Sequence, residues 1–354
     1  MSLPVSSTNC VQSSVATDNI TVEEQSANAI YERQLLQKRH GFPLWIPQPN
    51  MELPESYQQT GVSIGDVGLI TSYGAFDYLF NICLDANHPS NPEVLPEDFS
   101  PLSLSSANVR KFPEHSRGSY LTSISVIKQR FFQSPLLIFE CWRDFRGLTF
   151  RGSKSEGAIL AMPEGAYHED LRNRKAFRDY ATRNAASWYQ FVNGPLGCEL
   201  GNGELHLVTG CDKTTSWGIA SYNNNMQSDR TQDGPVLTFL TVTGDYRYPL
   251  RTTYSWEHDG MAEAKTWPEP DFDSGEDASG SSWTTRLCNQ TTFIRSFTIA
   301  VSDTIWKNLP FNLASEVETD TVELKSPQSF SSSSQRALSS TCLLLSTPRS
   351  SIAI

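Results

Sequence analysis

The chain has 354 residues, of which 38% are hydrophobic, and its formal net charge at pH 7 is −11. This length suffices for one large domain or two smaller ones with a sizeable core. The net acidity disfavours nucleic acid as a partner, because phosphate groups would be repelled. The charge is uneven, however: residues 101–200 carry 14 basic and 9 acidic groups, so a local basic surface is expected there.

No run of about 18 apolar residues, the length of a membrane-spanning helix, occurs in the sequence. The first residues, MSLPVSSTNCVQSS, lack the basic and apolar segments of a secretory signal peptide. The seven cysteines are scattered and odd in number, which favours reduced thiols over a disulfide framework. We therefore expect a cytoplasmic protein.

The chain begins with a Ser- and Thr-rich lead, residues 1–27, that predicts disorder. A single α+β domain is expected over residues 28–312, starting with a short helix. Residues 41–57 contain four prolines and predict an extended arm that docks its apolar side chains on the core.

Residues 61–83 predict a β-hairpin whose turn is Ser72-Tyr73-Gly74. Two later apolar runs, residues 119–132 and 135–150, fit helix or strand equally, because short apolar runs do not distinguish the two.

One long amphipathic helix is predicted at about residues 167–193, with Glu169 and Asp170 in its first turn and Gly194-Pro195 at its end. The pattern then favours strands separated by turns and by an acidic flexible loop, residues 268–282. These strands are expected at residues 204–209, 214–222, 235–243, 246–256 and 290–302.

The fold class is thus predicted as α+β, predominantly antiparallel β-sheet with one long helix and flexible termini. Residues 313–354 predict a disordered Ser-rich tail. Its composition changes abruptly at Ser326, which also fits a final exon translated out of frame.

The stretch LHLVTGCDKTTSWG contains Asp212 within DKTT, which resembles the nucleophile loop of phosphatases and pumps of the haloacid dehalogenase type. Thr215 replaces the glycine of such loops, Trp217 occupies space that must stay open, and no acidic magnesium motif follows. The surrounding pattern of strands also differs from the alternating strands and helices of that fold. A polar hairpin turn at Asp212 is the better interpretation.

The sequence GVSIG places Ser63 in the G-x-S-x-G pattern of a hydrolase nucleophile elbow. An elbow requires a strand before the serine and a helix after it, whereas polar sequence precedes Ser63 and a predicted hairpin arm follows. The two glycines fit a bulge or tight approach at the start of a strand better.

No metal site is predicted. Cys198, His206 and Cys211 lack the spacing of a zinc site, and the acidic loop lacks the twelfth-position ligand of an EF-hand. The remaining histidines stand in no suggestive setting, and no cofactor motif occurs.

The phrases GVSIGDVGLIT, HEDLRNRKAFRDYATRNAASWYQFVNG and LHLVTGCDKTTSWGIASY resemble a family of intracellular proteins of mushroom-forming basidiomycete fungi. The resemblance covers most of residues 30–305 and implies no activity, so no catalytic residue carries over. A looser similarity to the pore-forming domains of gasdermins implies a twisted antiparallel sheet with long hairpins and basic helices that bind acidic lipids.

Because both catalytic motifs lack their required context, the sequence favours a non-catalytic cytosolic recognition or scaffold protein with a protein partner. A membrane-active, gasdermin-like protein is the first alternative, and a hydrolase that uses Asp212 or Ser63 is the second. The basic residues equally fit the solvated side of a helix, and the tryptophans equally fit the core. The candidate interaction residues are Arg172, Arg174, Lys175, Arg178, Trp217 and Trp256.

Overall fold

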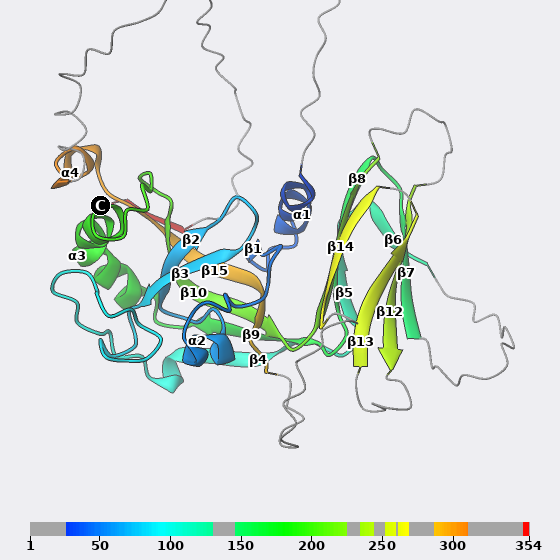
Figure 1. Ribbon diagram of the computed structural model, residues 1–354, viewed down its shortest axis with the longest axis horizontal. Helices are drawn as coiled ribbons and strands as arrows, with labels where there is room; N and C mark the ends of the chain where they lie inside the picture. The colour runs from blue at the N-terminus through cyan, green and yellow to red at the C-terminus, as the bar shows by residue number, and fades with distance from the viewer. Residues whose placement is uncertain are drawn as a thin grey trace, which may run out of the picture.

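The protein, represented by a computed structural model, has the predicted α+β fold, built from three largely antiparallel sheets and a single long helix (Figure 1). The structure describes residues 26–129, 146–224, 234–243, 252–259, 261–268, 287–310 and 350–353.

Sheet A is the largest sheet and carries most of the features considered below. Its main strands follow the order β1-β15-β10-β2-β3, and β9 and β4 extend it from the other half of β10. A short parallel strand, β16, pairs with β15. The strands are β1 (Phe42–Pro43), β2 (Asp66–Ile70), β3 (Phe76–Asn81), β4 (Val109–His115), β9 (Ala166–Leu171), β10 (Leu205–Thr214), β15 (Gln290–Ala300) and β16 (Ser350–Ala353).

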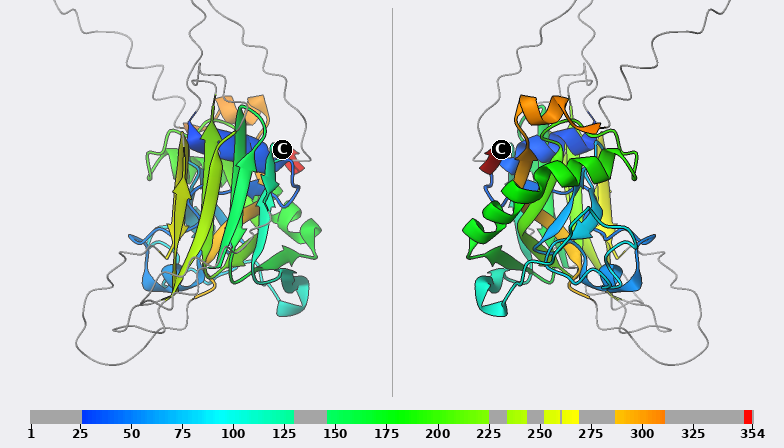
Figure 2. Two further views of the ribbon diagram at one scale, coloured as in Figure 1. Left: turned by 90° about the vertical axis from the view of Figure 1, so that its right-hand side faces the viewer. Right: turned by 90° about the vertical axis from the view of Figure 1, so that its left-hand side faces the viewer.

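Two four-stranded sheets form a β-sandwich beside sheet A (Figures 1 and 2). Aromatic and aliphatic side chains from both, including Phe150, Tyr222 and Phe239, form one buried cluster between them. Sheet B has the order β14-β11-β8-β5 and sheet C the order β13-β12-β7-β6. The bounds are β5 (Ser119–Thr122), β6 (Val126–Lys128), β7 (Arg146–Gly152), β8 (Glu156–Met162), β11 (Trp217–Asn223), β12 (Val236–Thr243), β13 (Thr252–His258) and β14 (Ala262–Trp267).

The helices cover the sheets at different places. Helix α1 (Ala27–Leu36) lies between sheet A and the sandwich (Figure 1), and α3 (Arg174–Asn193) packs on sheet A (Figure 2, right). A short helical turn at Ser106–Asn108 precedes β4. The remaining helices, α2 (Glu55–Thr60) and α4 (Asp303–Lys307), are also short.

Helix α3 begins later than the sequence pattern predicts. Residues Ala166–Leu171 form strand β9, which pairs with β10 on one side and β4 on the other. Glu169 and Asp170 therefore lie in a strand, and Asn173 caps the helix by accepting a hydrogen bond from the Ala176 amide. The predicted boundary was wrong because Leu171 is buried in either conformation, so its spacing from Phe177 does not locate the helix start.

Asp212 does not lie in a hairpin turn, so that interpretation was also wrong. Strand β10 continues through Asp212 to Thr214, and the turn follows at residues 215–216. The chain then leaves sheet A and enters sheet B as β11, which pairs with β8 and β14 rather than with β10. The polar residues of DKTT are typical of a turn, but Asp212 and Lys213 pair with β15 and β9 on either side, which places them in a strand.

The hairpin predicted at residues 61–83 is present as β2 and β3, with its turn at residues 71–75. In the proline-rich arm, Leu44 and Trp45 are buried, and the Trp45 amide donates to the Gly74 carbonyl oxygen (2.9 Å). The arm thus covers the face of sheet A opposite α3.

Several predictions lie outside the described residues. They are the disordered lead over residues 1–25, most of the acidic loop, the run LLIFECW, and the tail over residues 311–349. Four residues assigned to the tail, Ser350–Ala353, form β16.

Candidate functional site

Asp212 is the centre of a polar cluster inside the molecule. It lies on β10 opposite Phe293 of β15 and His168 of β9, so it has a strand on each side. Its side chain is 0% exposed. A carboxylate at such a position requires charged or hydrogen-bonding partners, because burial of an isolated charge is very unfavourable.

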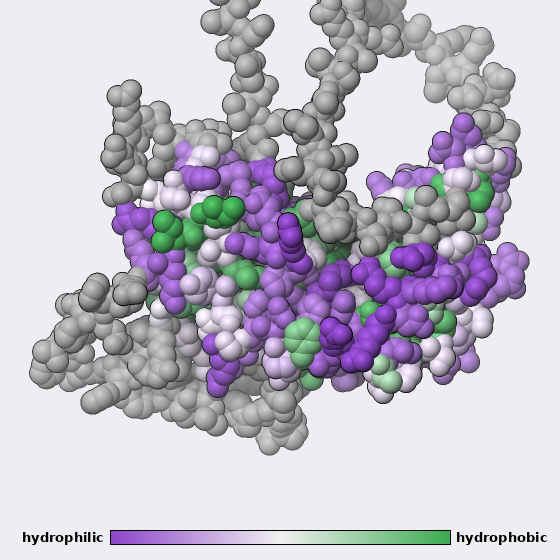
Figure 3. Space-filling view, turned by 180° about the vertical axis from the view of Figure 1, so that it is seen from behind, coloured by the Kyte–Doolittle hydropathy of each residue, from purple (hydrophilic) through white to green (hydrophobic). Residues whose placement is uncertain are grey.

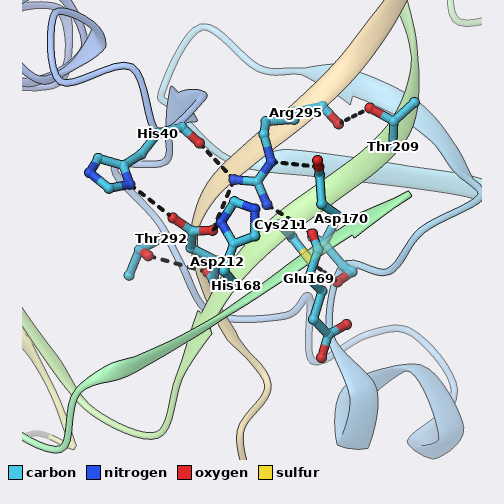
Figure 4. Close-up of polar contacts among 10 residues, drawn as sticks. His40, His168, Glu169, Asp170, Thr209, Cys211, Asp212, Thr292 and Arg295 are labelled. Atoms are coloured by element: carbon cyan, nitrogen blue, oxygen red, sulfur yellow. Dashed lines mark hydrogen bonds and ion pairs between the residues drawn. The ribbon is translucent and has the colours of Figure 1, made fainter. Parts of the chain in front are cut away.

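Three of the six histidines converge on Asp212. His168 Nδ1 lies 2.9 Å from Asp212 Oδ1, and His40 Nδ1 lies 3.5 Å from Oδ2 (Figure 4). The ring of His115, the last residue of β4, contacts that of His40 in a tilted arrangement with ring centroids 5.0 Å apart. The side chains of His40 and His168 are 19% and 18% exposed, so solvent reaches the rim of the cluster.

Arg295 of β15 fixes the other side of the carboxylate. Its Nη1 donates to Asp212 Oδ1 (2.9 Å) and to the His40 carbonyl oxygen (2.7 Å), while its Nε donates to Asp170 Oδ1 (3.0 Å). A Cβ atom at Gly210 would lie 2.3 Å from Asp170 Oδ1, so only glycine leaves room for this pair. Arg295 thereby links its own strand, β15, to β9, to β10 and to His40.

The neighbours of Asp212 determine its protonation. Burial alone would raise the pKa of the carboxyl group, but His168, His40 and Arg295 outweigh burial and hold the pKa well below its usual range. Burial and the nearby His40 lower the pKa of His115. The cluster therefore contains a carboxyl group that favours its ionised form beside an imidazole that favours its neutral form.

Three ligand atoms, one each from His40, His115 and Asp212, lie within 4.8 Å of one another. Imidazole and carboxylate are ligands that divalent transition metals accept. Sequence patterns do not detect this set, because its members are far apart along the chain and lie together only in the folded protein.

Ser63 is not placed as in a nucleophile elbow. Helix α2 precedes it and strand β2 follows, which reverses the required order. Its hydroxyl donates to the Gly61 carbonyl oxygen (2.9 Å), and Lys213 Nζ donates to Ser63 Oγ (3.2 Å) and to the Thr60 carbonyl oxygen (2.8 Å). A general base would accept the serine proton, whereas this ammonium group donates to the serine.

The four basic candidates lie at the start of α3. Arg172, Lys175 and Arg178 are exposed. Arg174 is half-buried, and its guanidinium lies 4.9 Å from the centroid of the Phe297 ring. The Arg172 amide donates a hydrogen bond to the Asn108 carbonyl oxygen (2.8 Å), which places edge strand β4 next to the start of α3.

The two tryptophan candidates are not exposed anchors. Trp217 is 0% exposed and donates from Nε1 to Gln290 Oε1 (3.2 Å), so its assignment to an interaction surface was wrong. Trp256 is partly buried against the sandwich core and donates from Nε1 to the Lys265 carbonyl oxygen (3.3 Å). Large aromatic side chains on half-buried strands belong to the core here, as composition alone suggests.

No protein-family model and no curated protein matches this chain. The resemblance to a fungal family and the looser similarity to gasdermins therefore stay predictions. Among the described residues, no helix has the length and apolar character needed to cross a membrane.

Proposed function

We propose that the protein is a non-catalytic cytosolic recognition protein that binds an acidic protein segment through the basic surface formed by α3 and β4. The observation that carries this proposal is a group of exposed cations on a chain of net charge −11. This surface, called the basic face below, consists of Arg110, Lys111, Arg172, Lys175, Arg178 and Arg183. Hydrophilic side chains predominate over hydrophobic ones on the described surface seen from behind (Figure 3).

Much of the charge on the basic face is not neutralised within the protein. Lys111 pairs with Glu169, and Lys175 pairs with Asp179. For Arg110, Arg172 and Arg183, the described residues provide no ion-pair partner closer than 4.0 Å. Unpaired arginines supply planar donors that match carboxylates, which favours an acidic partner.

The arrangement of the two candidate nucleophiles supports a non-catalytic role. The Asp212 carboxylate is held by Arg295 and is 0% exposed, so an incoming phosphoryl group would have to displace a buried ion pair. The Ser63 hydroxyl is a donor to the backbone and an acceptor from Lys213. Neither group is free to attack a substrate in this arrangement.

Binding of a fluorescent peptide of alternating Glu and Gly to the full chain tests the proposal. We expect saturable binding that weakens as salt is raised, because exposed charges are screened. The variant Arg172→Glu/Lys175→Glu should reduce binding at least about tenfold, since each reversal replaces attraction by repulsion. The variant Lys154→Glu/Lys307→Glu changes the net charge equally at exposed positions elsewhere and serves as the control.

The same preparations distinguish the alternatives. Dye release from phosphatidylserine vesicles that Arg172→Glu/Lys175→Glu abolishes, without peptide binding, would replace the proposal by the membrane-active alternative. Turnover in a hydrolysis screen that Asp212→Asn or Ser63→Ala abolishes would replace it by the hydrolase alternative. Equal peptide binding by both charge-reversal variants would refute the basic face as the binding surface.

A further inference from the structure

The two oxygens of the buried Asp212 carboxylate have different surroundings. Oδ1 accepts from Arg295 and contacts His168 at 2.9 Å. Oδ2 is fully buried and has no hydrogen-bond partner among the described residues, and His40 Nδ1 lies 3.5 Å from it. A buried carboxylate oxygen without a donor is unfavourable by roughly 1–3 kcal/mol or more, so this lone pair requires an explanation.

The same cluster contains another buried polar atom for which the described residues provide no hydrogen-bond partner. His115 Nε2 is buried and has no hydrogen-bond partner within the described part of the chain. His115 and His40 face each other, and one ligand atom of each lies within 4.8 Å of the other and of Asp212. The cluster therefore combines an ionised oxygen and two imidazoles, with unsatisfied lone pairs among them.

The distances suit a small divalent ion. A tetrahedral ion with ligand bonds of about 2.0–2.1 Å separates its ligands by about 3.3–3.4 Å. The distance from His40 Nδ1 to Asp212 Oδ2, 3.5 Å, is close to this value. The longest separation in the set is at most 4.8 Å, so a small closing movement of the two imidazoles brings the ligand atoms to this spacing.

Residues outside the ligand set would hold these ligands in place. Arg295 bonds Asp212 Oδ1 and the His40 carbonyl oxygen, so one guanidinium orients two of the three ligands. His168 contacts the same Oδ1 from β9. Outer partners of this kind point the free lone pair of a carboxylate at the metal in known sites.

We propose that His40, His115 and Asp212 Oδ2 form a binding site for a divalent transition metal ion of the Zn²⁺ class. Two imidazoles select borderline metals over Mg²⁺ and Ca²⁺, which prefer oxygen ligands. Three protein ligands leave one position of a tetrahedral ion for water. Arg295 and His168 are positioning residues, and this inference does not depend on the acidic partner proposed above.

Titration of the metal-stripped full chain with Zn²⁺, followed by calorimetry, tests the site directly. We expect one strong site per chain and a rise of the melting temperature with added Zn²⁺, because a ligand that binds only the folded state stabilises it. Co²⁺ should occupy the same site and give the visible absorption of a four-coordinate ion, which Zn²⁺ then abolishes.

The variants separate ligands from positioning residues. His115→Ala and His40→Ala should each weaken Zn²⁺ binding more than about 100-fold, whereas His168→Ala should weaken it about 10–100-fold, as outer-shell changes do. The exposed His258, on β13, provides the control His258→Ala, which should bind as the parent protein does. Far-UV circular dichroism checks the fold of each variant, and His115→Asn replaces His115→Ala if the latter does not fold.

Two outcomes would overturn the proposal. The parent chain could fail to bind Zn²⁺ and Co²⁺ more tightly than about 1 mM, or folded His40 and His115 variants could bind as tightly as His258→Ala. In either case the cluster is an ion-pair network that joins β9, β10 and β15 and holds no metal. Loss of the four-coordinate Co²⁺ spectrum in His115→Ala, but not in His258→Ala, would support the assigned ligands independently of affinity.

Discussion

Two aspartates that are almost completely buried have opposite pKa shifts, and the difference is explained by their neighbours. Asp212 has His168 at 2.9 Å, His40 at 3.5 Å and the Arg295 guanidinium at 2.9 Å, which together lower its pKa against the effect of burial. Asp66, at the start of β2, accepts from the Ser63 amide (2.7 Å) and from Asn81 Nδ2 (2.6 Å). Burial outweighs these bonds and raises the pKa of Asp66 to about 7.

This raised pKa predicts a pH dependence of stability. The folded chain keeps the Asp66 proton until about pH 7, whereas the unfolded chain releases it near pH 4. The folded state thus binds more protons between these values, and its free energy of unfolding falls as pH rises through this window. In Asp66→Asn this contribution, at most about 4 kcal/mol, is absent. Urea unfolding at pH 5, 6, 7 and 8 measures the difference between the two slopes.

The exposed Asp85 gives the matched control, since Asp85→Asn also removes one carboxyl group. The difference in unfolding free energy between this control and the parent should vary little over the same range. If Asp66→Asn and the parent show parallel slopes from pH 5 to pH 8, Asp66 is ionised throughout and the raised pKa is wrong.

Residue by residue, the sequence identified interesting positions but assigned them the wrong settings. Asp212 accepts a hydrogen bond from Arg295, and Ser63 accepts one from Lys213, and neither contact was predicted. The histidines around Asp212 were missed, because they come from distant parts of the chain. His168 lies opposite Asp212 in the pairing of β9 with β10, and His40 lies just before β1, which pairs with β15. Local patterns contain no information about such pairings.

At the scale of elements, local patterns succeed where a segment has its own turn. The hairpin of β2 and β3 is recognisable because Gly74 adopts a positive φ of 82° between two apolar arms. Strands β4, β8, β9 and β14 were not predicted. Strand β4 is largely polar and β8 is apolar after Glu156, so neither has the alternation of a half-buried strand.

The position at which α3 begins can be tested by whether one substitution raises or lowers the free energy of unfolding. Asn173 caps the helix, so Asn173→Ala should lower the free energy of unfolding by about 1 kcal/mol. If the helix began at residue 167, Asn173 would lie inside it, and alanine would instead stabilise the protein by several tenths of a kcal/mol. Urea unfolding measures the change.

Two further variants make the comparison specific. Asn173→Ser keeps a capping oxygen and should retain most of the stability. Thr182 is an exposed residue inside α3, and Thr182→Ala should be slightly stabilising. If Asn173→Ala stabilises the protein, the helix begins near residue 167, as the sequence pattern predicts.

At the scale of the whole molecule, one hydrophobic cluster joins sheet A to the sandwich. It contains Tyr31 of α1, Trp45 of the arm, Leu160 and Trp217 of sheet B, and Phe293 of sheet A. Trp217 adds a hydrogen bond to Gln290, at the start of β15. The chain itself crosses between the two parts after β4, β8, β10 and β14, so they share both backbone and core.

This shared cluster predicts that the two parts unfold together. Trp217→Ala removes one of the two largest fully buried side chains in the described part of the chain and should lower the free energy of unfolding by about 3–5 kcal/mol. Hydrogen exchange followed by mass spectrometry should then show faster exchange in α3 of the one part and in β12 of the other, by similar factors.

Trp217→Phe provides the comparison, because it keeps most of the buried volume and removes only the bond to Gln290. It should lower the free energy of unfolding less than Trp217→Ala does. Exchange in α3 and in β12 should again increase by similar factors, but by smaller ones than in the alanine variant. Faster exchange in β12 with unchanged exchange in α3 would mean that the sandwich unfolds by itself. In that case the cluster around Trp217 would be a contact between two independent units rather than a common core.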